Sequence, residues 1–194
     1  MAKLYFRYSA MNSGKTTALI QAAYNYEERG MRPLIVKPAV DSKGEHFVIS
    51  RLGIQRRVDI LLGASDSIPA LLKQHGHADC VLIDEAQFLT PVQVSDLFWY
   101  ANDQNVPVIA FGLRTDFKTE GFPGASRLLQ LAHEITELKT ICRCGKKALL
   151  NARKINGRFV LEGSQVEIDD KAHVEYEALC AQDYKKLVLL AQNA

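Results

Sequence analysis

The stretch Ser9-Ala10-Met11-Asn12-Ser13-Gly14-Lys15-Thr16 decides the fold, because it follows a strand-like apolar pattern and opens a segment of helical period. It fits the phosphate-loop pattern G-x-x-x-x-G-K-[ST] except at its first position, where Ser9 replaces glycine. Serine tolerates positive φ poorly, so we expect Ser9 to keep ordinary backbone angles. Backbone N–H groups and Lys15 would then face phosphates, and the Thr16 hydroxyl would hold Mg²⁺.

The second motif is acidic. It lies at the end of a short apolar run, where Asp84 and Glu85 follow Cys80-Val81-Leu82-Ile83. Neighbouring side chains at a strand end point to different sides, so Asp84 can face a Mg²⁺ ion while Glu85 acts as a general base. A solvated acidic turn is the simpler alternative. If Glu85 activates water, the protein is an ATPase; if it activates a substrate hydroxyl, the protein is a kinase.

The first 139 residues alternate apolar runs with segments of helical period, which predicts an α/β domain with a parallel sheet covered by helices. A β-rich appendage with a closing helix is expected over 140–194. The predicted strands are Leu4–Tyr8, Leu34–Lys37, Asp79–Ile83, Val106–Phe111, Ala148–Lys154 and Arg158–Glu162. The predicted helices are Thr16–Arg29, Ser67–His75, Thr90 to about Gln104, Pro123–Ala132 and Asp183–Gln192, and Asp41–Arg51 is expected to be a mobile loop.

Composition excludes several classes of protein. With 194 residues and a net charge of +2, the chain is long enough for a core and too evenly charged for its overall field to predict nucleic-acid or membrane binding. No apolar run approaches 18 residues, and Lys3 and Arg7 lie within an alternating, strand-like pattern instead of ahead of a signal-peptide core. We therefore expect a soluble, cytoplasmic protein whose cysteines are thiols or metal ligands.

Three of the four cysteines lie in the last third of the chain, as Cys142-Arg143-Cys144 and Cys180. Zinc prefers four tetrahedral ligands from cysteine, histidine or carboxylate groups, and Asp183 follows Cys180 at a suitable spacing. The alternatives are that His173 or a water molecule is the fourth ligand, or that the site has lost its metal. We expect a structural zinc site that clips two distant parts of the appendage together.

Several apolar side chains fall in loops beside the predicted phosphate site. A flat pyrimidine could stack on such groups, although each one is also compatible with a place in the core. The residues concerned are Met11, Phe88, Phe117 and Phe122.

Taken together, these motifs make the chain resemble the type II thymidine kinase family, which joins a phosphate-loop α/β domain to a small zinc-binding lasso domain. The matches run in family order through nearly the whole chain: Tyr8–Thr16, Asp84–Leu89, Phe111–Phe117, Glu137–Cys142 with Cys144 and Gly145, and Gln165–Ile168 before Tyr176 and Cys180.

The resemblance implies transfer of the γ-phosphate of ATP to the 5′-hydroxyl of thymidine or deoxyuridine. Glu85 would be the base and Lys15 would neutralise charge, with Mg²⁺ near Thr16 and Asp84. It also implies that Val166, Ile168 and Tyr176 belong to a lasso over the base, and that the protein is a homotetramer. The implied ATP-binding residues are Ser9, Ala10, Met11, Asn12, Ser13, Gly14, Lys15, Thr16, Asp84, Glu85, Ala86 and Gln87.

The chain departs from the family pattern at two places. Asp183 stands where the family usually has cysteine or histidine, and Asp169-Asp170 replace two glycines of the lasso. A rival hypothesis is a nucleic-acid-binding ATPase with a zinc ribbon, which only a mildly basic C-terminal part supports. Its basic residues are Arg143, Lys146, Lys147, Arg153, Lys154 and Arg158.

Overall fold

The computed structural model describes residues 1–40, 46–165 and 173–190. A six-stranded parallel sheet forms its centre, with the strand order β5-β2-β6-β7-β1-β8. This confirms the α/β fold class predicted from the sequence. The strands of the sheet are β1 (Leu4–Ser9), β2 (Pro33–Pro38), β5 (Ile60–Leu62), β6 (Cys80–Ile83), β7 (Val108–Leu113) and β8 (Glu134–Glu137).

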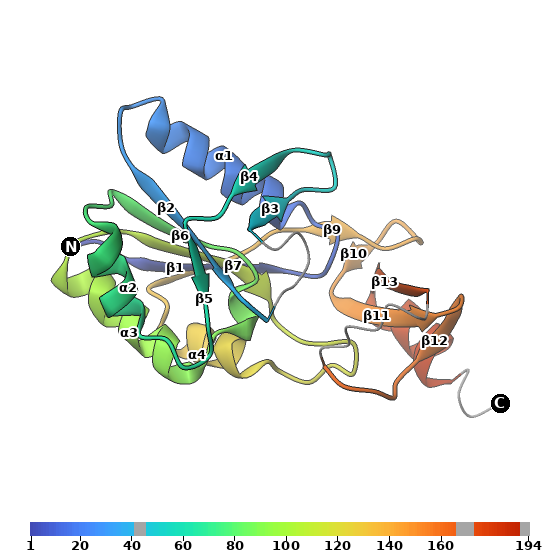
Figure 1. Ribbon diagram of the computed structural model, residues 1–194. Coiled ribbons are helices and arrows are strands. Elements are labelled where there is room, and N and C mark those ends of the chain that lie inside the picture. Colours follow the sequence, from blue (N-terminus) through green and yellow to red (C-terminus); the bar gives the residue numbers. More distant parts are fainter. Residues whose placement is uncertain (41–45, 166–172, 191–194) are drawn as a thin grey trace.

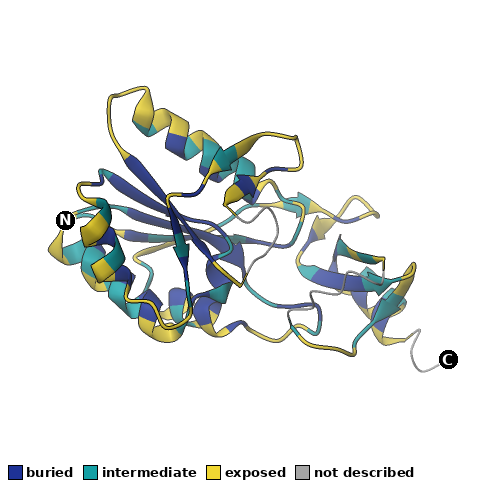
Figure 2. Cartoon of the chain, viewed as in Figure 1, coloured by how far each residue is buried: buried dark blue, intermediate teal, exposed yellow. Residues whose placement is uncertain are grey.

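Helices cover both faces of this sheet (Figure 1). One face carries α1 (Lys15–Glu27), and the other carries α2 (Ile68–His75), α3 (Pro91–Asp103) and α4 (Pro123–Leu131). Strand β6 serves both layers, because Cys80 and Leu82 pack on the α1 side while Val81 and Ile83 pack on the opposite side. Figure 2 shows the resulting band of buried strands.

The signal for a helix start at Thr90 is confirmed in detail. The backbone N–H of Gln93 donates to the Thr90 hydroxyl at 3.2 Å, and the Gln93 side chain accepts from the Thr90 backbone N–H at 3.0 Å. This capping box satisfies donors that a helix N-terminus otherwise leaves unpaired.

The C-terminal part is β-rich, as predicted. It contains a hairpin of β9 (Thr140–Ile141) and β10 (Lys147–Ala148), and an antiparallel sheet β12-β11-β13. Asn156 and Gly157 both have positive φ, at 50° and 81°, and form the predicted tight turn between β11 and β12. The bounds are β11 (Leu150–Ile155), β12 (Arg158–Val160) and β13 (Val174–Leu179).

Two predicted segments differ from the structure. The closing helix begins earlier than Asp183, as α5 (Ala181–Tyr184) capped by Cys180, and continues as a π-helical segment η2 (Lys185–Leu189). Residues of the expected mobile loop form β3 (Phe47–Ile49), which pairs with β4 (Gln55–Arg57) and buries Val48 in the α1-side core. Periodicity did not indicate either difference: the helix starts at the Cys180 cap, and β3 is held by its pairing with β4 and by burial of Val48.

Some predicted features lie outside the described residues. These are Val166 and Ile168 of the expected lasso, the acidic pair Asp169-Asp170, and the first five residues of Asp41–Arg51. The division of the chain at residue 139 stays a prediction.

Gly124 marks a close approach between α4 and the backbone that follows β6. A Cβ at this position would lie 2.4 Å from the carbonyl oxygen of Leu89 and 2.9 Å from those of Ala86 and Gln87. All three are backbone atoms, so no side chain can swing away to relieve the overlap. Glycine at 124 therefore sets how closely α4 packs against the segment that carries Glu85.

We predict that Gly124→Ala lowers the free energy of unfolding by about 2–4 kcal/mol, because the methyl group forces the helix and this segment apart. Urea unfolding measures the change. Gln130→Ala, an exposed position of the same helix, is the matched control and should change stability by less than about 0.5 kcal/mol. Equal stability of the two variants would contradict the close approach.

Candidate active site and metal centre

A cleft of about 640 Å³ opens at the carboxyl end of the parallel sheet. In open parallel sheets this edge is where ligands bind. The phosphate loop, the acidic pair Asp84-Glu85 and the β3–β4 hairpin line the cleft. Ser9 ends β1 with ordinary backbone angles, as predicted, and the positive φ values of the loop fall at Asn12 and Gly14.

Lys15 is buried at the base of α1, with 8% of its surface exposed. Its Nζ lies 3.2 Å from the Ser9 hydroxyl and 3.4 Å from the carbonyl oxygen of Ala10. Burial lowers the pKa of Lys15, and the nearby charges of Glu85 and Asp84 oppose that change. An anionic ligand in the cleft would favour the charged ammonium in the same way.

Asp84 is buried beside Thr16, whose hydroxyl donates to Oδ2 at 3.3 Å. Its other oxygen, Oδ1, is buried and has no hydrogen-bond partner among the described residues. Burial, followed by the charge of Glu85, raises the pKa of Asp84 to about 7. A buried carboxylate with one unpaired oxygen beside a hydroxyl fits a hard cation such as Mg²⁺.

Glu85 has a left-handed backbone, with φ at 48°, and leads into the short 3₁₀ helix η1 (Ala86–Phe88). The side-chain amide of Gln87 donates to Glu85 Oε2 at 2.5 Å. The same side chain accepts from the backbone N–H of Leu113 at 2.9 Å, at the end of β7. Glu85 is therefore held by a buried amide that is itself fixed to the neighbouring strand.

The predicted base-contacting residues fall into two groups. Met11, Phe88 and Phe122 pack on the same core cluster, and the rings of Phe88 and Phe122 meet edge to face at 5.6 Å. Phe117 is separate from this group, with 1% of its surface exposed and the Arg153 guanidinium 3.8 Å from its ring centroid. Tyr176 lies on β13, close enough to the phosphate loop for its carbonyl oxygen to accept from the Asn12 side chain at 3.3 Å.

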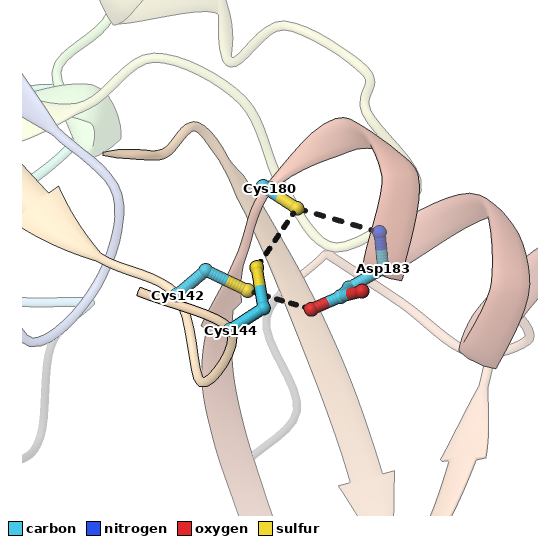
Figure 3. A group of neighbouring side chains, drawn as sticks. All are labelled: Cys142, Cys144, Cys180 and Asp183. Atoms are coloured by element: carbon cyan, nitrogen blue, oxygen red, sulfur yellow. Dashed lines mark hydrogen bonds between the residues drawn. The ribbon is translucent and has the colours of Figure 1, made fainter. Parts of the chain in front are cut away.

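The second site is the cysteine group of the C-terminal part. Cys142, Cys144, Cys180 and Asp183 place their ligand atoms within 4.8 Å of one another (Figure 3). The Cys144 and Cys180 sulfurs are 3.6 Å apart, and the Cys142 sulfur is 3.1 Å from an Asp183 oxygen. Hydrogen bonds from the Cys142 and Cys144 thiols lower the pKa of Asp183. Three thiols and a carboxylate at this spacing fit a tetrahedral metal such as zinc.

His173, the other candidate ligand, is exposed and lies 3.1 Å from Glu175 instead. The structure therefore brings Asp183, and not His173, to the three cysteines.

Two residues of these sites escaped the sequence analysis. Lys37, at the end of β2, is 1% exposed and lines the cleft, with its Nζ 3.5 Å from the carbonyl oxygen of Phe47. A lysine closing an apolar run was the available signal. Asn151 of β11 is 2% exposed and contacts the phosphate loop, and no local pattern marks it.

The raised pKa of Asp84 makes a prediction about stability. Because the folded pKa lies above the ordinary value near 4, the folded chain binds more protons than the unfolded chain between about pH 4 and pH 7. Stability therefore falls as pH rises through that window. Without divalent cations, Asp84→Asn should be more stable than the parent chain at pH 8, by of order 1 kcal/mol or more, and equally stable near pH 4.

Urea unfolding at pH values from 4 to 8 measures this difference. Asp103→Asn, at an exposed aspartate of α3, is the matched control and should follow the parent chain at every pH. Parallel pH profiles for Asp84→Asn and the parent chain would show that Asp84 is not the titrating group.

Comparison with known proteins identifies the family of the chain. The family model described as thymidine kinase matches residues 2–184. The thymidine kinase of Legionella pneumophila strain Paris is 47% identical, over 96% of this chain and 90% of its own length. That of Chromobacterium violaceum is 47% identical, over 94% and 97%, and that of Ruegeria pomeroyi is 44% identical, over 96% and 95%.

One solved structure, titled as a DNA replication initiation factor, is 18% identical and covers 71% of this chain and 40% of its own. Its TM-score of 0.44 is too low to bear on function. The family model and the relatives, by contrast, span nearly the whole chain and both of its sites. The chain belongs to the thymidine kinase family.

Proposed function

We propose that this protein phosphorylates thymidine, transferring the γ-phosphate of ATP to the 5′-hydroxyl and releasing dTMP and ADP. The observation that carries the proposal is the arrangement of one cleft, in which Glu85 is held by Gln87 beside the buried Lys15 and Asp84. Membership of the thymidine kinase family supports the choice of acceptor.

Glu85 is the residue that we assign as general base. Its carboxylate accepts the proton of the 5′-hydroxyl as that oxygen forms a bond to the γ-phosphorus, and the bond from phosphorus to the ADP oxygen breaks. The hydrogen bond from Gln87 leaves the second carboxylate oxygen of Glu85 to take the proton. Lys15 stabilises the negative charge that moves onto the phosphate oxygens in the transition state.

The phosphate loop would hold the triphosphate through its backbone N–H groups and the N-terminus of α1. Thr16 and Asp84 would hold Mg²⁺, and the fit rests on the unpaired, buried Oδ1 of Asp84. When bound, this cation neutralises charge between the phosphate groups. We place the remaining ATP contacts on the residues named from the resemblance, Ser9 to Thr16 and Asp84 to Gln87.

We propose that the nucleoside lies between the acidic pair and the C-terminal part. Met11 lines the cleft and packs on the same core cluster as Phe88 and Phe122, Phe117 lies against Arg153 of β11, and Tyr176 lies on β13. We assign nucleoside contacts to these five residues. Val166 and Ile168 complete the proposed contacts. A buried pyrimidine edge would leave polar atoms unpaired if cytosine replaced thymine, which favours thymidine over deoxycytidine.

We propose zinc as the metal of the cysteine group, with Cys142, Cys144, Cys180 and Asp183 as its ligands. The ligands come from the β9–β10 connection and from the junction of β13 with α5, so the ion would clip these segments together. Its role is structural, because the site has four protein ligands and lies apart from the cleft-lining residues.

The rival hypothesis of a nucleic-acid-binding ATPase has little to support it. Arg143 and Lys154 both pair with Glu177, and Lys147 pairs with Glu137. Arg153 is almost completely buried. These residues therefore do not form the open basic surface that phosphate backbones require.

No helix in the described part of the chain is long and apolar enough to cross a membrane. Location in the cytoplasm and a homotetrameric state stay predictions, supported by the resemblance to the family.

We predict that Glu85→Gln lowers kcat by about 100- to 10,000-fold and changes the Kd for thymidine by less than about threefold, because glutamine keeps the contact with Gln87 but cannot take a proton. ADP release from ATP measures turnover, with thymidine, with water alone and with single-stranded DNA. Thymidine-dependent release at the full rate is expected only from the parent chain and from Glu28→Gln, a matched control at an exposed glutamate.

Near-normal turnover of Glu85→Gln would remove Glu85 from its assigned role. Release at equal rates with and without thymidine would overturn the kinase proposal itself, and stimulation by DNA would favour the rival.

We predict about one zinc ion per purified chain by elemental analysis. Asp183→Ala should release zinc to a chelator about tenfold faster or more, and Asp183→Cys should release it more slowly than the parent chain, because thiolate is the softer ligand. Glu175→Ala, which removes an exposed carboxylate of β13, is the control and should match the parent chain. Purified chain without stoichiometric zinc would contradict the site.

A further inference from the structure

The phosphate loop has a second side, which faces away from the cleft and packs into the C-terminal part. Ala10 is 6% exposed and belongs to the same apolar cluster as Ala152 and Ala178. The backbone N–H of Met11 donates to Asn151 Oδ1 at 2.7 Å. One loop thus takes part in the cleft through Lys15 and in the C-terminal core through Ala10.

Asn151 of β11 joins this loop to a third segment. Its amide nitrogen donates to the carbonyl oxygen of Thr115 at 3.0 Å, while its Oδ1 accepts from Met11. Thr115 opens the connection from β7 to α4, and it bridges to Gly121 across that connection. With 2% of its surface exposed, Asn151 uses both ends of a buried amide to link the phosphate loop with the segment that carries Phe117.

Arg153 lies two residues further along β11, so it projects from the same face of the strand as Asn151. Its guanidinium covers the ring of Phe117 at 3.8 Å. It also donates to the carbonyl oxygen of Ser164 at 3.2 Å and to that of Glu162. Arg153 is 1% exposed, and it thereby joins the same β7–α4 segment to the residues from which the chain continues toward the predicted lasso.

Strand β13 contacts both β11 and the phosphate loop. Arg153 is the direct antiparallel partner of Tyr176, and Asn151 is the partner of Ala178. The carbonyl oxygen of Tyr176 accepts from the Asn12 side chain of the phosphate loop. The segment that carries Phe117 and the strand that carries Tyr176 are therefore one or two hydrogen bonds from the phosphate loop.

We propose that Asn151 and Arg153 are positioning residues that couple ATP binding to thymidine binding, so that a filled phosphate loop raises the affinity for the nucleoside. The inference rests on the proposed function. Polar groups this deeply buried cannot exchange their partners for water without cost, so any shift of the loop on phosphate binding would be passed to β11 and the Phe117 segment. By linkage, thymidine then tightens ATP binding by the same factor.

The test compares the Kd for thymidine, measured by titration calorimetry, with and without a non-hydrolysable ATP analogue and Mg²⁺. We expect the analogue to lower this Kd by about fivefold or more in the parent chain. Asn151→Ala and Arg153→Lys should each reduce that factor to less than about twofold, while the Kd of the analogue alone changes little. Lysine keeps the charge of Arg153 but loses the planar contact with Phe117 and the second donor.

Two matched controls separate coupling from general damage. Asn25→Ala removes an exposed asparagine of α1, and Arg158→Lys changes an exposed arginine of the neighbouring strand β12. Both should keep the parent coupling factor. If Asn151→Ala fails to fold, the coupling factor of Arg153→Lys alone tests the proposal. This variant is expected to fold, because lysine preserves the charge and most of the volume of the side chain.

The coupling proposal is overturned if the parent chain binds thymidine equally well with and without the analogue, or if the folded variants keep the parent factor. Failure of the parent chain to bind thymidine under any condition would instead overturn the proposed function. A loss of analogue affinity in the variants, with an unchanged coupling factor, would assign the two residues a structural role only and would also count against the proposal.

Discussion

Burial of opposite charges in one cleft is the constraint on which the site depends. Lys15 and Asp84 both lie at the carboxyl end of the sheet, and burial disfavours the charged form of each. Each charge partly offsets the penalty of the other, which explains why they are placed together. The sheet, α1 and η1 can then be understood as a frame that holds these two groups in a buried position beside Glu85.

Local sequence was sufficient for most of this frame. The phosphate loop, the apolar run ending in Asp84 and the capping box at Thr90 are each set by residues within a few positions of one another, so periodicity and spacing predicted them. The cysteine group with Asp183 was also predictable, because ligand chemistry limits the candidates. The roles assigned to these residues stay proposals.

The contacts that join the two halves of the chain were not predictable in this way. Met11 and Asn151 are 140 positions apart in the sequence. A single asparagine within a strand-like pattern does not indicate which backbone group its side chain will bind. Likewise, Arg153 counts among the basic residues of the C-terminal part, and charge usually indicates exposure. In the structure it is buried, because its guanidinium stacks on the Phe117 ring and donates to two carbonyl oxygens. The β3–β4 hairpin depends on burial of Val48 against α1, which only the folded chain reveals.

The cysteine group and the cleft are linked by one strand. Cys180 follows β13 directly and caps α5, so a metal held by Cys180 and the Cys142–Cys144 turn would fix the end of β13. Two positions earlier, Ala178 pairs with Asn151, and Tyr176 pairs with Arg153. A structural ion would thus fix the end of β13, whose partner strand β11 holds the phosphate loop through Asn151. An ion outside the cleft could therefore still influence the cleft, because the phosphate loop is hydrogen-bonded to Asn151 of β11 and to Tyr176 of β13.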